Sequence, residues 1–296
     1  MITIKKVEIA EYSGFCFGVN RAMEMAESEL NIASKNQNKI YSIGSLIHNE
    51  QALDRLKEKG LIISDNVEHF EKNSSAIIRS HGLSKSFYDR MEDINVNIID
   101  ATCPFVKKIQ SIVHEGSEEG YKIIVIGDKN HPEVIGILGW AQGETYTINS
   151  IDDAYSFDSS NNSKYLVVVQ TTFNVDRYQK IEYILKNKIA NVVFHNTICY
   201  ATKERQESAE KLSKKVDAMV VIGGKKSSNT LKLAEICRSN CKTFLIETAE
   251  DLDYDDIKDL EYIGIAAGAS TPDFIIREVY DYIVNKIQFK ELEFND

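Results

Sequence analysis

Three cysteines, Cys16, Cys103 and Cys199, are the residues of this 296-residue chain that could best hold a reactive centre. They are widely and similarly spaced, and each follows a strand-like stretch and immediately precedes a segment with helical periodicity. Pro104 suits the first helical position after Cys103, and the partial positive charge at a helix start favours a thiolate. We therefore expect three similar units that each donate one thiol to a common centre. From spacing alone, each cysteine could equally be a small buried residue at a crowded turn.

Three thiolates leave one coordination position unfilled, whether the centre is zinc or an iron–sulfur cluster, and an open position can take a substrate. Zinc sites usually contain close Cys-x-x-Cys pairs, and none of these three cysteines has such a partner. A 4Fe–4S cluster with three cysteine ligands and an open fourth iron fits the wide spacing better. Cys237 and Cys241 lie four residues apart near the end of a predicted helix and are interpreted as packing residues.

Three of the six histidines, His48, His81 and His131, follow predicted strands. A single histidine is more often structural than catalytic, but the equivalent placement of three favours a shared site. Glu133 stands two residues after His131, where the pair could act as a short proton relay. The acid could equally be a helix N-terminal residue that opposes the macrodipole.

A glycine-containing loop, residues 223–230, has the form of an anion site at the start of a helix. It lacks the residue order of a Walker A loop, so nucleotide binding is not supported. Taken alone, the loop could be a capped helix after a glycine turn. Neutral hydroxyl and amide donors suited to a diphosphate come from this loop and from two others: Ser227, Ser228, Asn229, Thr171 and Ser270.

Short β-branched runs alternate with helical segments throughout the chain, which predicts an α/β fold with mainly parallel sheets. The loops after parallel strands gather at one edge of a sheet, so the candidate residues above are expected there. Six strands are predicted, at residues 39–43, 76–79, 122–126, 165–169, 218–222 and 262–266.

Composition limits the classes of function. The chain has 43% hydrophobic and 27% charged residues, which is typical of a folded globular protein. Its net charge of −10 gives no general attraction to nucleic acid or to an anionic membrane, so we expect neither partner. The longest apolar runs are strand-sized, and the first twelve residues lack a signal-peptide core. A cytoplasmic protein is expected.

An ordered set of motifs running from about residue 14 to residue 273 resembles the LytB/IspH family. No single motif is specific, whereas the set in this order is. The motifs are Gly14 to Ala22 (GFCFGVNRA), His48-Asn49, Ser80-His81-Gly82, Asp100 to Pro104 (DATCP), His131 to Val134 (HPEV), Gln170-Thr171-Thr172, Ile198 to Thr202 (ICYAT), Ser227-Ser228-Asn229 and Gly268-Ala269-Ser270.

The resemblance implies three α/β units in pseudo-threefold arrangement around a central iron–sulfur cluster. Their expected bounds are residues 1–102 with Cys16, 103–197 with Cys103, and 198–296 with Cys199. One 4Fe–4S cluster per chain would have these three cysteines as its metal ligands, and its fourth iron would bind the substrate hydroxyl. By matching position, Glu133 would be the proton source, with His131 and Thr171 also catalytic. The substrate-binding residues would be His48, His81, His131, Thr171, Ser227, Ser228, Asn229 and Ser270.

The activity implied by this resemblance is reductive dehydroxylation of (E)-4-hydroxy-3-methylbut-2-enyl diphosphate. The products would be isopentenyl and dimethylallyl diphosphate, in the last step of the methylerythritol phosphate route to isoprenoids. An electron donor such as flavodoxin or ferredoxin is implied as partner. Three residues, Phe17, Asn20 and Lys226, depart from the family pattern. Many relatives carry a smaller residue and an acid at the first two positions, and the anion loop often has an asparagine at the third.

Two other functions use the same three cysteines. An open-iron dehydratase acting on a hydroxy acid would need no net reduction, but a carboxylate substrate favours arginine clamps, which the candidate loops almost lack. A non-enzymatic iron–sulfur sensor would not require three histidines, Glu133 and a diphosphate-like pocket.

Overall fold

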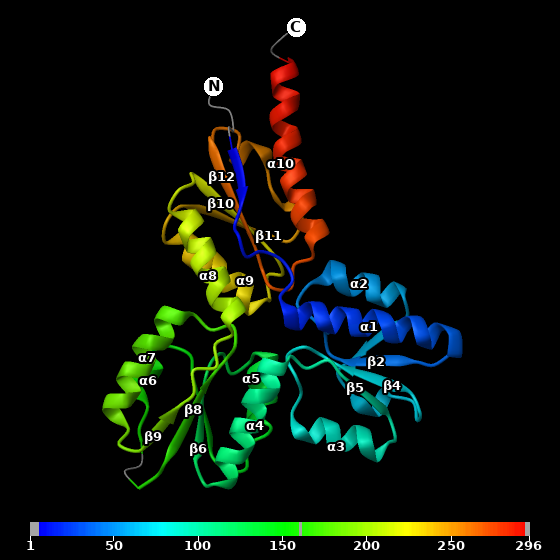
Figure 1. Cartoon of the computed structure of the whole chain (residues 1–296), viewed down its shortest axis with the longest axis vertical. Coiled ribbons are helices and arrows are strands. Elements are labelled where there is room, and N and C mark those ends of the chain that lie inside the picture. Colours follow the sequence, from blue (N-terminus) through cyan, green and yellow to red (C-terminus); the bar gives the residue numbers. More distant parts are fainter. Residues whose placement is uncertain (1–5, 160–161, 294–296) are drawn as a thin grey trace. The chain divides into compact units, whose positions relative to one another are not determined.

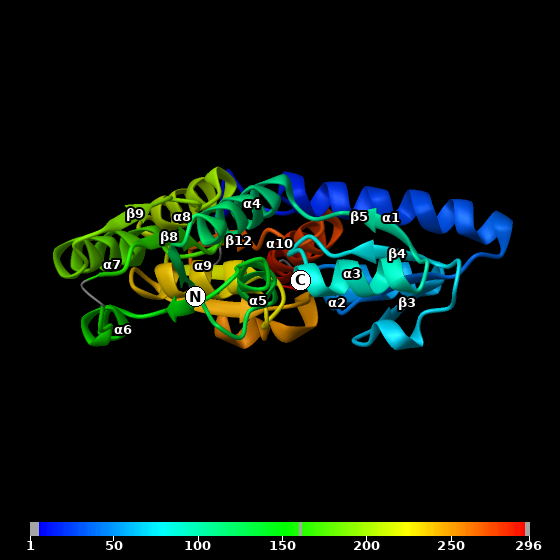
Figure 2. The same ribbon diagram turned by 90° about the horizontal axis from the view of Figure 1, so that it is seen from below.

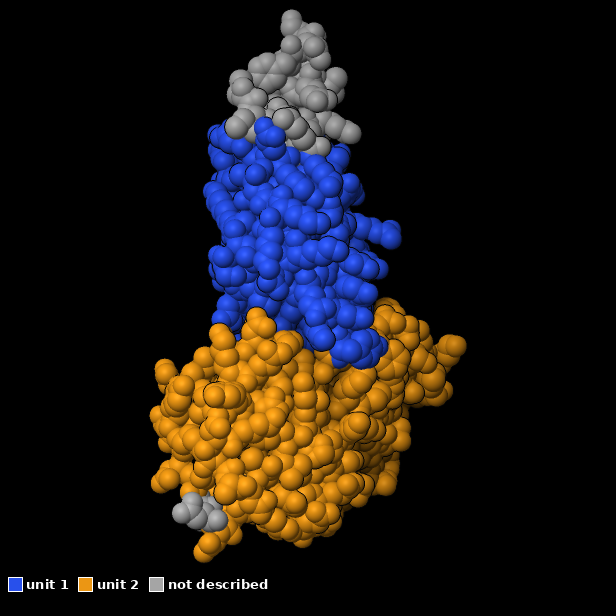
Figure 3. All heavy atoms as spheres, turned by 60° about the vertical axis from the view of Figure 1, so that its left-hand side comes forward, with its two compact units in different colours: residues 1–16, 48–50, 200–296 blue, residues 17–47, 51–199 orange. Residues whose placement is uncertain are grey.

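The computed structural model describes residues 6–159 and 162–293 and shows an α/β protein with three four-stranded sheets (Figures 1 and 2). Neighbouring strands in all three sheets are parallel, so the predicted fold class is confirmed. The chain divides into two compact units, coloured blue and orange in Figure 3. Unit 1 comprises Met1–Cys16, His48–Glu50 and Tyr200–Asp296, and unit 2 comprises Phe17–Ile47 and Gln51–Cys199.

Unit 2 holds two of the sheets. Sheet B has the order β3-β2-β4-β5, and sheet C has the order β7-β6-β8-β9. The strands of sheet B are β2 (Ile40–Ile43), β3 (Leu61–Ser64), β4 (Ser75–Ile78) and β5 (Asn97–Asp100). The strands of sheet C are β6 (Lys122–Ile126), β7 (Thr145–Ile148), β8 (Tyr165–Val169) and β9 (Val192–Phe194). The helices in this part of the chain are α1 (Phe17–Asn36), α2 (Glu50–Glu58), η1 (Val67–His69), α3 (Lys85–Asp93), α4 (Pro104–Glu118), α5 (Pro132–Leu138), α6 (Ile151–Ser156) and α7 (Val175–Lys188).

Unit 1 is built on sheet A, which has the order β1-β12-β10-β11. Its strands are β1 (Lys6–Ile9), β10 (Ala218–Ile222), β11 (Lys242–Ile246) and β12 (Tyr262–Ala267). Its helices are α8 (Tyr200–Ser213), α9 (Ser228–Arg238), η2 (Ala249–Asp251), η3 (Tyr254–Asp256) and α10 (Asp273–Glu293). Among the described residues, no helix combines the length and apolar character needed to cross a bilayer.

The three sheets share one strand order. In each sheet two central strands, β2 and β4, β6 and β8, or β10 and β12, lie between two edge strands. Sheets B and C take their last edge strand, β5 or β9, from the chain that directly follows, whereas sheet A takes β1 from the start of the chain. The division into units 1–102, 103–197 and 198–296 stays a prediction, as does their pseudo-threefold arrangement.

Successive apolar side chains of the central strands point to opposite faces of the sheet, and helices cover both faces, as in sheet C. On one face, Ile124 and Val167 pack against α7, and on the other Ile123, Val125 and Val168 pack against α4 and α5. Each fully buried aliphatic side chain of this kind contributes roughly 1.5–3 kcal/mol to folding. Burial on both faces holds the carboxyl ends of β6 and β8 side by side, and the loops that carry chemistry begin at these ends.

Candidate active site

Each of the three widely spaced cysteines lies between an edge strand and the start of a helix. Cys16 follows β1 and precedes α1, Cys103 follows β5 and is the N-cap residue of α4, and Cys199 follows β9 and precedes α8. Pro104 occupies the first turn of α4, as predicted. The partial positive charge at a helix start stabilises an ionised thiol relative to a neutral one.

The main chain holds these three cysteines in the same way. The backbone N–H of each donates a hydrogen bond to a carbonyl oxygen in the loop after β12, β4 or β8, the second central strand of each sheet. The bonds join Cys16 to Ala269, Cys103 to Ser80 and Cys199 to Thr171, with N···O distances of 3.1, 3.0 and 3.0 Å. Each cysteine is therefore fixed to a loop that also carries a candidate substrate-binding residue: Ser270, His81 or Thr171.

The thiols of these cysteines suit metal ligation because they are half-buried and reduced. Gly18 on α1 lies so close to Cys103 that a Cβ added to it would be 2.6 Å from the sulfur. Helix α1 therefore packs against this thiol with no side chain between them. Cysteine is present at all three positions, and cysteine thiolates are the usual ligands of iron–sulfur clusters. The type of donor atom therefore fits such a cluster.

The two other cysteines have a different environment. Cys237 is fully buried on α9, and burial raises the pKa of its thiol to about 12. Burial also raises the pKa of Cys241. A thiol that stays protonated is a poor metal ligand, so the environment agrees with the prediction that both are packing residues.

Glu133 is an acid in the first turn of α5 and is only 2% exposed. Its Oε1 accepts the backbone N–H of Thr171 at 2.6 Å, and its Oε2 accepts the Thr171 hydroxyl at 2.7 Å. Pairing of β6 with β8 fixes this geometry, because α5 follows β6 and Thr171 follows β8. The Thr171 carbonyl in turn accepts the N–H of Cys199. A hydrogen-bonded line thus runs from Glu133 through Thr171 to the main chain of Cys199.

Burial raises the pKa of Glu133 to about 7, although both hydrogen bonds from Thr171 act to lower it. Near neutral pH the carboxyl group therefore exists in both protonation states. An acid with this pKa can give up a proton in a catalytic step and take it back afterwards. The side-chain hydroxyl of Thr171 is within hydrogen-bond distance of Oε2, at 2.7 Å.

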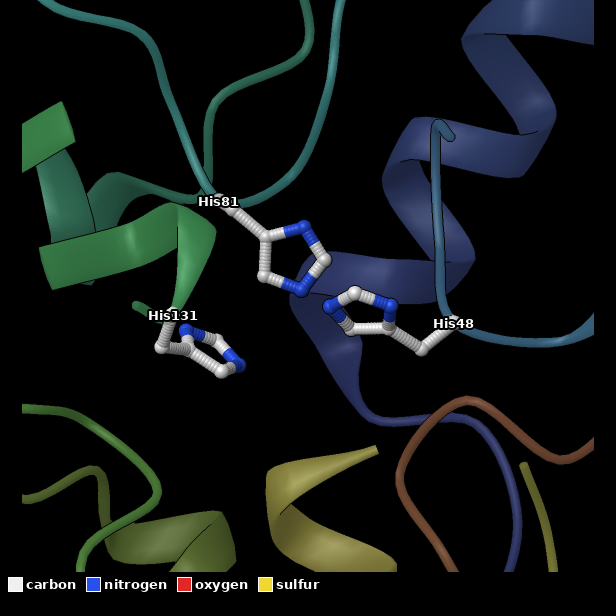
Figure 4. Close-up of side chains that lie close together, drawn as sticks. All are labelled: His48, His81 and His131. Carbon is white, nitrogen blue, oxygen red and sulfur yellow. The ribbon is translucent and has the colours of Figure 1, made fainter. Parts of the chain in front are cut away.

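His131 is the N-cap residue of α5 and lies beside His81. Its Nδ1 accepts the N–H of Glu133 at 3.2 Å, which places the proton of the neutral ring on Nε2. The rings of His81 and His131 meet edge to face with centroids 5.5 Å apart (Figure 4). The two candidate histidines of unit 2 therefore lie together, and the third, His48, belongs to unit 1.

The loop that carries His81 is fixed by its neighbours in unit 2. The indole Nε1 of Trp140 donates to the carbonyl oxygen of Leu83 at 2.9 Å, and the Gln110 amide donates to the same oxygen at 3.3 Å. On α5, Gly136 packs directly on this loop, since a Cβ added to it would lie 3.5 Å from the His81 carbonyl oxygen. These contacts hold His81 against the helix that starts at His131.

In unit 1, the start of α9 has the arrangement of an anion site. Ser227 is the N-cap residue, and its hydroxyl accepts the N–H of Thr230. Asn229 is 3% exposed, and neither polar atom of its amide has a hydrogen-bond partner among the described residues. A buried unpaired polar group costs roughly 1–3 kcal/mol, which is accounted for if a ligand pairs with it. Ser228 is half-buried in the same turn.

His48 and Ser270 meet near this turn. The Ser270 hydroxyl donates to the His48 carbonyl oxygen at 3.0 Å. A Cβ added to Gly224 would lie 2.6 Å from the same oxygen, so this position has no room for a side chain. Unit 1 thus brings together the loops after β10 and β12 and the segment that carries His48.

Arg205 is a positioning residue that was not predicted from the sequence. It is 6% exposed on α8, and its guanidinium donates to the carbonyl oxygens of Gly14 at 2.8 Å and Ala201 at 3.0 Å. Gly14 lies two residues before Cys16, so Arg205 fixes the segment that leads to this cysteine. The available signal was its helical spacing from Ala209 and Leu212, which are both buried. Trp140 carried a simpler signal as the only tryptophan of the chain.

Comparison with known proteins identifies a family. The chain matches the LytB protein family over residues 7–284. It is 48% identical to a protein of Thermoanaerobacter sp. (strain X514) over 98% of this chain and 99% of that protein. It is 46% identical to a protein of Clostridioides difficile (strain 630) over 94% of this chain and 99% of that protein. Both relatives are named 4-hydroxy-3-methylbut-2-enyl diphosphate reductase.

Solved structures agree. A reductase from Plasmodium falciparum, described as acting on E-1-hydroxy-2-methyl-but-2-enyl-4-diphosphate, matches with a TM-score of 0.87 and 31% identity over 95% of this chain and 87% of that chain. A structure described as (E)-4-hydroxy-3-methyl-but-2-enyl diphosphate reductase, the terminal enzyme of the non-mevalonate pathway, matches with a TM-score of 0.68 and 38% identity over 96% of this chain and 100% of that chain. The resemblance seen in the sequence motifs is thereby confirmed, and the chain belongs to the LytB family.

Proposed function

We propose that the chain catalyses the reductive dehydroxylation of (E)-4-hydroxy-3-methylbut-2-enyl diphosphate to isopentenyl and dimethylallyl diphosphate, the last step of the methylerythritol phosphate pathway. Two electrons and two protons are consumed, the allylic C–O bond breaks, and the oxygen leaves as water. The names of the relatives support this reaction, and the chain is an oxidoreductase like them. Within this chain, the observation that carries the proposal is the buried Glu133, which is bonded to Thr171 and through it to the main chain of Cys199.

Cys16, Cys103 and Cys199 are the proposed ligands of one 4Fe–4S cluster per chain. When bound, the cluster supplies the electrons, and its fourth iron, open to the substrate, acts as a Lewis acid toward the hydroxyl group. Support comes from the donor type and the common placement of the three thiols at helix starts. The backbone bond of each cysteine keeps its thiol at a fixed place in its unit.

Glu133 is the proposed proton source, and Thr171 is proposed to lie near the substrate hydroxyl. Hydroxide is a poor leaving group, and protonation turns it into water. The proton leaves Oε2 of Glu133 for the Thr171 hydroxyl, which passes its own proton to the departing oxygen. His131 lies beside this path, and because its Nδ1 accepts the Glu133 N–H, the proton of its neutral ring is on Nε2.

The diphosphate is held by neutral donors and imidazoles in this proposal. In a chain with a net charge of −10, an anion needs donors that are placed locally. The unpaired buried amide of Asn229 and the N–H groups at the start of α9 are suited to phosphate oxygens. The full set proposed for the diphosphate is His48, His81, Ser227, Ser228, Asn229 and Ser270, with His131 beside it.

A flavodoxin or ferredoxin is the proposed electron donor, and the cytoplasm is the proposed location.

Glu133→Gln tests the mechanism, because glutamine keeps the shape of the side chain but cannot act as the acid. We expect turnover to fall by roughly 10²- to 10⁴-fold while iron content and affinity for the substrate stay unchanged. Product formation is measured anaerobically with a chemical reductant, and Glu115→Gln, an exposed position on α4, is the matched control. Full activity in Glu133→Gln would remove Glu133 as the proton source.

A further inference from the structure

Phe17 begins α1 and is 58% exposed, which is high for a large apolar ring. One exposed aromatic residue carries little information by itself. Its neighbour Gly18, however, packs on the sulfur of Cys103, and Pro104 at the start of α4 is exposed as well. Two exposed apolar residues therefore flank the place where α1 meets a proposed cluster ligand.

Cations follow these apolar residues at a spacing of one helical turn. Arg21 lies four residues after Phe17 on α1, and Lys108 lies four residues after Pro104 on α4, so each pair shares a helix face. Lys108 is exposed, and Arg21 is half-buried.

Three contacts connect two cations, Arg21 and Lys107, to the end of the strand before Cys103. The guanidinium of Arg21 donates to the carbonyl oxygens of Asp100 and Thr102 at 3.4 and 3.3 Å. The Lys107 ammonium lies 2.7 Å from the Asp100 carboxylate, so the nearby negative charge is already paired. We call Phe17, Arg21, Pro104, Lys107 and Lys108 the α1–α4 surface.

Asn20 also lies on α1, between Phe17 and Arg21 in the sequence, and it carries no charge. Phe17 adds apolar area to this surface. The Asn20 amide donates to the Glu24 carboxylate at 2.7 Å, and this hydrogen bond leaves the negative charge of Glu24 in place on the same helix. Phe17 and Pro104 thus give the surface an apolar centre. Lys107 and Asp100 offset each other, so the two charges of Arg21 and Lys108 outweigh that of Glu24.

We propose that the α1–α4 surface docks a small acidic electron-carrier protein, which transfers one electron at a time to the cluster through Cys103. The inference rests on the proposed function, because a reductase needs an electron donor. Electron-transfer complexes typically use small interfaces. Positive charge around an apolar centre attracts an acidic partner and orients it. The starts of α1 and α4 add their partial positive charge.

The test uses the full chain with its cluster, and an oxidised flavodoxin and an oxidised acidic ferredoxin as probes. The dissociation constant is measured by calorimetry at low and at physiological ionic strength. The double variant Phe17→Ala with Lys108→Glu removes one apolar and one charged member of the surface. The matched control is Tyr183→Ala with Lys180→Glu on α7, where Tyr183 is 72% exposed and Lys180 is also exposed.

We expect at least one carrier to bind, and to bind more weakly at the higher salt concentration. The surface variant should weaken binding by roughly tenfold or more, and the control variant by less than about twofold. Equal weakening by both variants, no weakening by either, or no binding of either carrier to the unchanged chain would overturn the proposal.

Iron content and melting temperature of each variant show whether it folds and holds its cluster. Turnover with dithionite, which needs no docking surface, should be the same in the surface variant and in the unchanged chain. Dithionite-driven turnover without carrier binding would overturn this inference alone. Absence of turnover with dithionite in the unchanged chain would overturn the proposed function instead.

Discussion

The starts of α5 and α9 occupy equivalent places in sheets C and A but carry different kinds of polar group. Each helix follows a central strand, β6 or β10, and each loop begins with a glycine, Gly127 or Gly223. The start of α5 buries the ionisable Glu133, whereas the start of α9 buries the neutral Ser227 and Asn229. In the proposed function, this one position of the scaffold serves proton transfer in sheet C and anion binding in sheet A.

Physical chemistry accounts for this division. A carboxylate beside a diphosphate would repel it, so neutral donors suit the proposed anion site. A buried carboxyl group far from compensating charge keeps its proton up to a higher pH, which suits an acid catalyst. Exchanging the two kinds of group should therefore damage both functions.

The largest effect is expected from Asn229→Asp, which puts an acid into the anion site with almost no change in shape. Repulsion between like charges costs several kcal/mol, so affinity for inorganic diphosphate should fall by roughly 10²- to 10³-fold. Asn229→Ala, which only removes the amide, should lose about tenfold. Calorimetry with inorganic diphosphate measures both. Equal affinity in Asn229→Asp and the unchanged chain would contradict the assignment of this loop.

The next effect concerns stability. Because burial raises the pKa of Glu133 from 4.5 to about 7, the folded chain binds more protons than the unfolded chain between these values. Stability therefore falls as pH rises through this range, by about 3 kcal/mol in total, and levels off above pH 7. Glu133→Gln removes this loss, so its stability relative to the unchanged chain should increase between pH 5 and pH 8. Denaturant unfolding at both pH values tests the sign, and a smaller relative stability at pH 8 would refute it.

A third effect concerns turnover. Since Glu133 must be protonated to act as the acid, kcat should decrease as pH rises above about 7, by about tenfold per pH unit. The residual activity of Glu133→Gln should lack this decrease. Initial rates with a chemical reductant at saturating substrate give the profile. A decrease that persists in the glutamine variant would assign the titration to another group.

The smallest effect is expected at Trp140, which positions His81 from a distance. Trp140→Phe keeps an aromatic ring but loses the hydrogen bond to Leu83, while the bond from Gln110 remains. Affinity for inorganic diphosphate should fall about three- to tenfold, with kcat nearly unchanged. Tyr146→Phe on β7 is the control, because it loses a surface hydrogen bond to Glu144. Similar affinities in the two variants would argue against a positioning role.

The sequence predicted the centre of each sheet better than its edges. All six predicted strands exist, as β2, β4, β6, β8, β10 and β12, and they are the central strands of the three sheets. These strands are buried on both faces and therefore read as continuous apolar runs, such as Tyr165–Val169. The six strands that were not predicted are all edge strands. Asn97–Asp100 has only two apolar residues between polar ends, and Val192–Phe194 is only three residues long, so neither forms an apolar run of ordinary strand length.

For the candidate site, residue types and loop positions were predictable, and long-range partners were not. The proximity of His131 and Glu133 is visible in the sequence because both lie in one helical turn. The bond between Glu133 and Thr171 depends on the pairing of β6 with β8, which no local pattern specifies. The same holds for Arg205, whose partner Gly14 is distant in the chain. Positioning residues are recognised by what they contact, and a single sequence does not contain that information.

The central claim, a cluster with one open iron, is tested most directly by counting iron and labile sulfide in anaerobically purified protein and recording Mössbauer spectra with and without the allylic diphosphate. The account predicts about four irons per chain, with one changed by the substrate. Cys103→Ser should lose iron, and Cys237→Ala should keep it. Zinc, or no metal after careful reconstitution, would contradict the account.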